Sequence, residues 1–191
     1  MEITIEVTSN CQAKCPGCIR HKVFNPDTEL VSNPPKNLNL PVDVHKRFID
    51  ELVGKVQYLT YDGSFGDSPF HPQFNELIEY SARTLKGDIE PFGDENLGNL
   101  SPKFKGLHDL TISTNGSYKT PEFWKNLGEI LHEHLPGRHH VMFDLDGTDN
   151  ETQNMYRVAT NWLNIMDFGS FREIEYKELK QKQYRLLWLK N

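Results

Sequence analysis

The sequence predicts an α/β fold in which strands and helices alternate along the chain. Four apolar strand-like runs are each followed by a helical pattern, and polar or glycine-rich turns close the strands. This order favours a parallel sheet with right-handed crossovers. The 191 residues fit one ordinary domain, and none of the apolar runs approaches the ~20 residues needed to span a membrane.

The first strand–helix unit contains a long connection. Apolar and polar residues alternate over 3–7 and stop at Ser9-Asn10, which predicts a strand that ends there. Residues 25–41 hold four prolines, so we interpret them as an irregular connection. Apolar residues at helical spacing over 44–53, with Gly54 behind them, predict the first helix.

The second unit pairs a strand over 56–61 with an amphipathic helix over 74–85. The glycine-rich turn over 62–69 separates them. The glycines, prolines and scattered charges of residues 87–106 indicate an inserted surface loop.

The last two units are shorter. A strand over 110–112 precedes a helix that begins with Thr120 as N-cap and continues to Leu135. The fourth strand covers 141–145, and a helix is expected over about 150–165. We therefore divide the chain into a core, residues 1–166, and a charged amphipathic tail, residues 167–191.

The net charge and the N-terminal segment argue against some classes of function and location. The chain has 21 Lys and Arg against 27 Asp and Glu, a formal net charge of −6. Nucleic-acid affinity depends largely on basic residues, so this balance argues against a nucleic-acid partner. Met1–Val7 lacks the basic head and apolar centre of a signal peptide, and we expect a cytoplasmic protein.

The three cysteines carry the clearest chemical signal. Cys11, Cys15 and Cys18 are the only cysteines, and an odd number cannot form a closed set of disulfides. Three thiols in one loop indicate a metal site. Their C-x3-C-x2-C spacing alone leaves open an iron–sulfur cluster, a zinc site with His21 as fourth ligand, and three structural thiols.

The unusual turns all follow strands. Ligands of parallel sheets collect at the carboxyl ends of the strands, where we place the cysteine loop, the turns over 63–69 and 113–116, and Asp146-Gly147. We expect these four segments to meet at one site.

With these motifs, the sequence resembles the radical S-adenosylmethionine (SAM) superfamily from about residue 3 to residue 162. Gly66-Asp67-Ser68-Pro69 is similar to the family's G-G-E-P turn, and Ser113-Thr114-Asn115-Gly116 matches its S-T-N-G turn. Phe143-Asp144-Leu145-Asp146-Gly147 resembles the S-x-D-G strand end with Asp144 in place of serine. Gly17 replaces the usual aromatic residue before the third cysteine.

The resemblance implies a partial (β/α) barrel with about four recognisable strand–helix units, where family members usually have about six. A C-terminally truncated chain, similar to compact phage and bacterial members, is the expectation. Cys11, Cys15 and Cys18 would bind a [4Fe–4S] cluster whose fourth iron is chelated by SAM. The residues implied in SAM binding are Gly66, Asp67, Ser113, Asn115 and Arg157, and Asp146 is the implied catalytic residue.

The implied reaction is the reductive cleavage of SAM to a 5′-deoxyadenosyl radical, with reduced flavodoxin or ferredoxin as electron donor. The substrate is left unidentified, because its contacts come largely from variable or missing parts. Two alternatives stay open: an activase that makes a glycyl radical on a partner protein, and a truncated, non-catalytic fragment that binds an iron–sulfur cluster or zinc.

Overall fold

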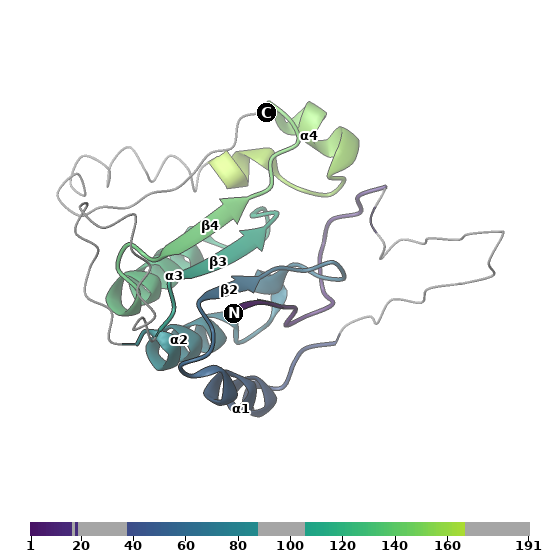
Figure 1. The fold of residues 1–191 in the computed structure, drawn as a ribbon. Helices are drawn as coiled ribbons and strands as arrows, with labels where there is room; N and C mark the ends of the chain where they lie inside the picture. Colours follow the sequence, from purple (N-terminus) through teal and green to yellow (C-terminus); the bar gives the residue numbers. More distant parts are fainter. Residues whose placement is uncertain (17, 19–37, 88–105, 167–191) are drawn as a thin grey trace, which may run out of the picture.

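The computed structural model describes residues 1–16, 18, 38–87 and 106–166, and Figure 1 shows them as one sheet with helices. The sheet has the strand order β1-β2-β3-β4, and every neighbouring pair is parallel. Alternation of strands and helices is therefore confirmed. The strands are β1 (Glu2–Ile5), β2 (Tyr58–Tyr61), β3 (Asp109–Thr114) and β4 (His139–Phe143).

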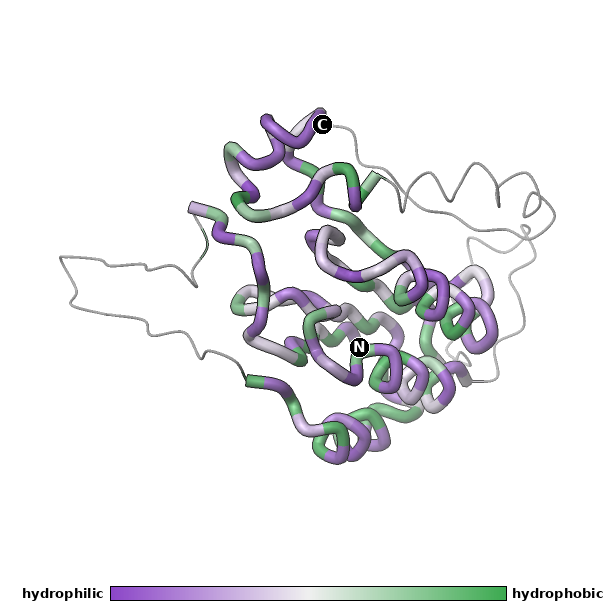
Figure 2. The backbone as a smooth tube through the Cα atoms, turned by 180° about the vertical axis from the view of Figure 1, so that it is seen from behind, coloured by the Kyte–Doolittle hydropathy of each residue, from purple (hydrophilic) through white to green (hydrophobic). Residues whose placement is uncertain are grey.

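Three helices lie together on one face of this sheet (Figure 1 and Figure 2). Helix α1 contacts α2, and α2 contacts α3. Consecutive strand order with helices on one side is the winding of a (β/α) barrel, whereas a doubly wound sheet carries helices on both faces. The helices are α1 (Val42–Leu52), α2 (Phe74–Leu85) and α3 (Pro121–His134), and α4 (Asn150–Tyr156) lies beyond the carboxyl end of β4.

The core fills the space between the sheet and these helices. Strand β3 alternates, with Leu110, Ile112 and Thr114 buried and the residues between them partly exposed. Helix α2 buries an apolar face at helical spacing, which is why this segment folds as an amphipathic helix. The core includes Ile5, Leu59, Tyr61, Phe74, Leu77, Ile78, Leu110, Ile112, Leu127 and Leu131.

Leu110 tests this packing. Its side chain is fully buried in the central strand β3, so Leu110→Ala should lower the free energy of unfolding by about 3 kcal/mol. Leu163 is 59% exposed, and Leu163→Ala should change the same quantity by less than about 0.5 kcal/mol. Urea denaturation of the two variants checks the difference, and equal effects would contradict the burial of Leu110.

Several expected boundaries are corrected by the structure. Strand β4 begins at His139, two residues before the expected start, so His139 and His140 belong to the strand. The predicted helix over 150–165 is wrong as a single element. Helix α4 ends at Tyr156, Ala159 takes a positive φ of 66°, and residues 162–166 are helical again.

Side-chain hydrogen bonds explain the end of α4. Asn154 Nδ2 donates to the Thr160 carbonyl at 3.0 Å, and Thr160 Oγ1 donates to the Arg157 carbonyl at 2.7 Å. These bonds satisfy main-chain groups in a turn and so compete with continuation of the helix. By contrast, the predicted N-cap of α3 is confirmed, because the Thr120 side chain accepts from Phe123 N.

Two expectations concern other parts of the chain. The charged tail over 167–191 lies outside the described residues, as does all but the two ends of the loop expected over 87–106. In the part of the chain that is described, no helix combines the length and apolarity needed to cross a membrane.

Candidate functional site

A cavity of about 90 Å³ lies at the carboxyl ends of the strands. All three cysteines line it, and so do residues at or beyond the ends of β2, β3 and β4. Three of the four segments expected to meet here, the cysteine loop and the turns over 63–69 and 113–116, therefore contribute to one site. Asp146-Gly147 does not line the cavity, whereas Asp144 of the same strand end does. The cavity lining includes the five residues predicted to bind SAM, Gly66, Asp67, Ser113, Asn115 and Arg157.

The cysteine loop is fixed at both of its described ends. Beyond β1, Ser9 N donates to the Leu38 carbonyl at 2.9 Å. Further along, Lys14 N donates to the Val158 carbonyl at 2.7 Å, which joins the loop to the segment after α4. Ordinary backbone pairing thus brings the loop over the sheet end.

The three cysteines are half-buried and form no disulfide. Burial raises the pKa of the Cys15 thiol, while the nearby Arg157 guanidinium acts in the opposite direction. Within residues 1–16, 18, 38–87 and 106–166, no three His, Cys, Asp or Glu side chains are grouped so as to hold a metal ion. His21, the fourth zinc ligand considered above, and Gly17 lie outside the described residues.

Asn115 connects the turns that surround the cavity. Its Nδ2 donates to Asp67 Oδ2 at 2.7 Å, and its Oδ1 accepts from Gln12 Nε2 at 2.8 Å. The same Nδ2 lies 3.5 Å from Cys11 Sγ. One buried amide therefore joins the cysteine loop to the turns after β2 and β3. Gln12 was not singled out from the sequence, because its partner lies 103 residues away.

Asp67 is a buried carboxyl group that forms no ion pair within the described part of the chain. Burial raises its pKa to about 7, although hydrogen bonds from Thr114 and Asn115 act in the opposite direction. The backbone N–H of Asp67 donates to the Asn10 carbonyl at 2.8 Å, which fixes the turn against the cysteine loop. Asp67 therefore sits at the contact between two turns, and its charge depends on pH near neutrality.

The raised pKa of Asp67 predicts a pH-dependent stability. The rise in pKa from 3.8 to about 7 is about three units, which corresponds to a change of about 4 kcal/mol in the free energy of unfolding. The unfolded chain loses this proton near pH 4 and the folded chain near pH 7. The contribution is therefore fully present below pH 4 and is lost as pH rises to about 7. Asp67→Asn should flatten this part of the stability curve, measured by urea denaturation of the metal-free protein from about pH 4 to about pH 8.

A matched carboxyl group provides the control for Asp67. Glu79 is exposed on α2, so Glu79→Gln should leave the wild-type curve unchanged. Parallel curves for wild type and Asp67→Asn would show that Asp67 titrates near its ordinary pKa.

Gly66 lies where the turn after β2 touches the chain leaving β1. A Cβ built on Gly66 would overlap the main-chain carbonyl of Thr8, and a backbone atom cannot rotate away as a side chain can. Glycine is therefore required by close approach at this position.

Arg157 contacts two aspartates that follow β4. Its Nη2 lies 3.3 Å from Asp144 Oδ2, and its Nε donates to Asp146 Oδ2. Burial raises the pKa of Asp144, with Arg157 opposing the rise. Asp144 lines the cavity, whereas Asp146, the predicted catalytic residue, is held beside Arg157 at its rim.

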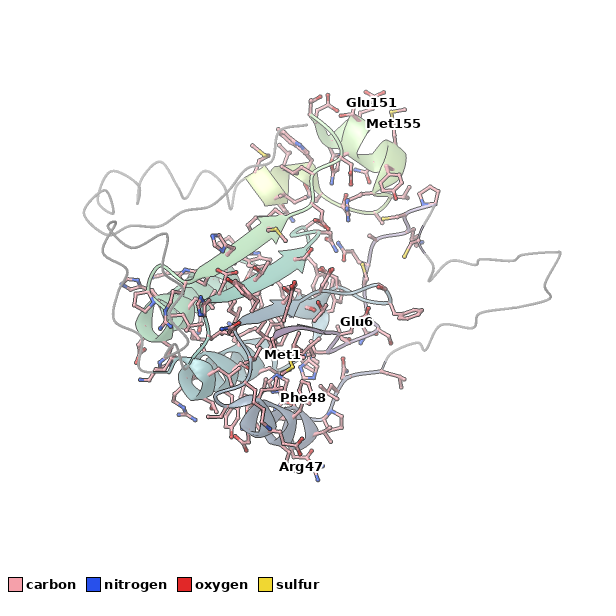
Figure 3. The ribbon with its side chains drawn as sticks, in the orientation of Figure 1. Met1, Glu6, Arg47, Phe48, Glu151 and Met155 are labelled. Atoms are coloured by element: carbon pink, nitrogen blue, oxygen red, sulfur yellow. The ribbon has the colours of Figure 1, made fainter. Side chains whose placement is uncertain are left out.

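Glu6 supports the glycine-rich turn after β2 by accepting hydrogen bonds from its backbone. Its carboxylate accepts from Ser64 N and, at 3.4 Å, from Phe65 N, and Figure 3 shows Glu6 beside the loop that follows β2. Glu151 and Met155 point outward from α4 in the same view, away from the sheet. Asp62, Gly63 and Ser64 of this turn also line the cavity, a role that the sequence pattern of the turn did not assign to them.

The protein is of the α/β class. Its consecutive strand order, and a cavity at the carboxyl ends of the strands, are those of part of a single-wound (β/α) barrel. A solved structure of anSMEcpe, a radical SAM enzyme, described as a histidine-tagged protein with bound AdoMet, has this architecture. It matches 95% of the present chain with a TM-score of 0.51 and 16% sequence identity. The four parallel strands alternating with helices match part of a radical SAM partial barrel, which confirms the predicted fold class.

The structural match covers less than half of the anSMEcpe chain. The match covers 42% of the anSMEcpe chain, so the present chain spans about two fifths of it. No protein-family model and no curated protein matches the sequence. The likeness thus establishes the fold, and AdoMet is the ligand of that other protein.

Proposed function

We propose that this chain binds a [4Fe–4S] cluster through Cys11, Cys15 and Cys18 and cleaves SAM reductively at the adjoining turns. One observation carries the proposal: the three cysteines and residues from the ends of three other strands line the same cavity. When bound, the cluster would supply the electron that breaks the sulfonium bond of SAM and releases a 5′-deoxyadenosyl radical.

The donor set suits a cluster better than a single zinc ion. Each cysteine thiolate of a four-iron cluster binds a different iron. The three sulfurs therefore need to line a common cavity, and they need not converge on a single metal ion. Zinc needs four ligands converging tetrahedrally. Three cysteines that form no disulfide and line a common cavity meet the first requirement.

The chain's own residues would position SAM. Gly66 lines the cavity where its turn packs against the Thr8 carbonyl, and the Ser113 hydroxyl and the Asn115 amide provide polar groups on the next turn. The Arg157 guanidinium is suited to a carboxylate, since its fork donates two parallel hydrogen bonds. Asp144 pairs with Nη2 and Asp146 with Nε, so a SAM carboxylate would bind at the Nη1 side of the guanidinium or replace one of these ion pairs.

The two aspartates then have different roles in the proposal. Asp144 lines the cavity, while Asp146 would hold Arg157 in place. Asp146 thus acts as a positioning residue in this arrangement.

Anaerobic reconstitution tests the proposed function. The full chain is loaded with iron and sulfide, reduced with dithionite or with reduced flavodoxin or ferredoxin, and incubated with SAM. We expect about four irons per chain, a change in the EPR spectrum of the reduced cluster on SAM addition, and 5′-deoxyadenosine by chromatography. Binding of one zinc ion per chain, or a cluster whose EPR spectrum does not change on SAM addition, would overturn the proposal in favour of a non-catalytic metal-binding fragment.

A further inference from the structure

The inner face of the sheet, which is turned away from α1, α2 and α3, continues the cavity toward the amino ends of the strands. In β3, Leu110 and Ile112 are buried among the helices, so Thr111 and Ser113 face the other way. Ser113 lines the cavity, and Thr111 lies two residues, or about 7 Å, below it along the strand. The cavity and Thr111 therefore share one surface.

A row of polar side chains crosses this surface. The strand register pairs Thr4 with Thr60, Thr60 with Thr111, and Thr111 with His140. Paired residues of neighbouring strands lie on the same face, so three hydroxyl groups and one imidazole stand side by side. His140 is four residues, or about 13 Å, before the cavity residue Asp144 on the same strand face.

Acidic side chains predominate on the described part of this surface, where Arg157 pairs with Asp144 at the carboxyl end. The four strands contain no lysine or arginine. Carboxylates surround the polar row at the same alternation: Glu2, Glu6, Asp62, Asp109 and Asp144. An acidic surface raises the local concentration of cations.

Asp109 organises the hydrogen bonds of the row. Its Oδ1 lies 2.6 Å from His140 Nδ1, and its Oδ2 accepts from Thr111 Oγ1 at 2.7 Å. When the imidazole is neutral and its Nδ1–H donates to this carboxylate, Nε2 is the acceptor. The Thr111 oxygen, having donated its hydrogen, also has acceptor lone pairs left. Both groups are therefore set to receive hydrogen bonds from a donor.

We infer that the inner face binds the substrate of the proposed reaction through a protonated amine, which donates to His140 Nε2 and Thr111 Oγ1 beside the Asp109 carboxylate. The substrate class is an amine-bearing polar molecule, long enough to reach from this row to the cavity. The inference rests on the proposed function for the reaction, but the amine site is built from residues that do not line the cavity with the cysteines. Asp109 acts through His140 and is a positioning residue.

Titration with 1,4-diaminobutane tests the amine site, and 1,4-butanediol is the neutral control of equal length. The probe is the His140 Nε2 resonance of the ¹⁵N-labelled full chain without its cluster, assigned through His140→Gln. The diamine should shift this resonance saturably in the millimolar range, and the diol should not. Asp109→Asn should weaken the diamine at least about tenfold, and Thr111→Val should weaken it less. Glu79→Gln on α2 should leave the affinity unchanged.

Three results would overturn the inference: no shift with the diamine, an equal shift with the diol, or undiminished binding in Asp109→Asn. An equal response of His132 and His134 on α3 would show general attraction of amines to an acidic protein and would also overturn it. The far-ultraviolet spectrum and melting temperature of each variant establish that it is folded. Because the titration needs no cluster, its outcome is independent of whether SAM is cleaved.

Discussion

Replacing Gly66 with alanine should reduce 5′-deoxyadenosine formation by about 100-fold or more. The new Cβ would overlap the Thr8 carbonyl, so the turn after β2 must move away from the chain that leads into the cysteine loop. That movement also breaks the bond from Asp67 N to the Asn10 carbonyl. Displacing cofactor-binding groups by about 1 Å is enough for a rate loss of this size. Single-turnover assays of reconstituted protein measure the loss.

Gly128 offers a matched control for this substitution. It lies within α3, and a Cβ added there would meet nothing within 4 Å. Gly128→Ala should keep full activity and raise the free energy of unfolding by about 1 kcal/mol, because alanine favours helix over glycine. Full activity of Gly66→Ala would show that the turn after β2 does not hold SAM.

Replacing Cys15 with alanine should abolish cluster assembly and all SAM cleavage. The chain has three cysteines and no spare thiolate to take the place of the lost ligand. Iron content after reconstitution should fall from about four per chain to near zero, as measured by colorimetric iron assay. Cys11→Ala and Cys18→Ala should behave alike, since each thiol lines the same cavity.

His21 separates the cluster from the zinc alternative. His21→Ala should leave iron content and SAM cleavage unchanged, because three thiolates suffice for the cluster. A chain that binds one zinc ion and loses it on His21→Ala would contradict the cluster assignment.

The sequence was sufficient to predict the elements whose patterns are local. Apolar spacing located α1, α2 and α3, and the Thr120-Pro121 pair identified the start of α3. The carboxyl-end rule for parallel sheets brought the cysteine loop, the Gly66 turn and the Ser113 turn together before their contacts were known. These predictions succeed because a periodic apolar face has few ways to be buried.

Contacts between distant polar groups were beyond sequence reasoning. Asn115 was predicted as a SAM-binding residue, but nothing in the sequence marks Gln12, and only the fold brings the two amides within 2.8 Å. The end of α4 was missed for a similar reason, because the Asn154–Thr160 hydrogen bond competes with helix continuation that the sequence pattern allows. His140 was placed before its strand, which hid its register with Thr111 and its contact with Asp109.

The hydrogen bond from Lys14 N to the Val158 carbonyl has a consequence for biosynthesis. A ribosome adds about 5 to 20 residues per second, so the roughly 140 residues between Cys18 and Val158 take about 7 to 28 seconds to make. During that interval the three thiols are present, but the segment around Val158 that pairs with their loop has not yet been synthesised. Under the proposed function, the cluster site would be complete only after Val158 has been made, so the supply of iron and sulfide during expression would govern how much protein acquires a cluster.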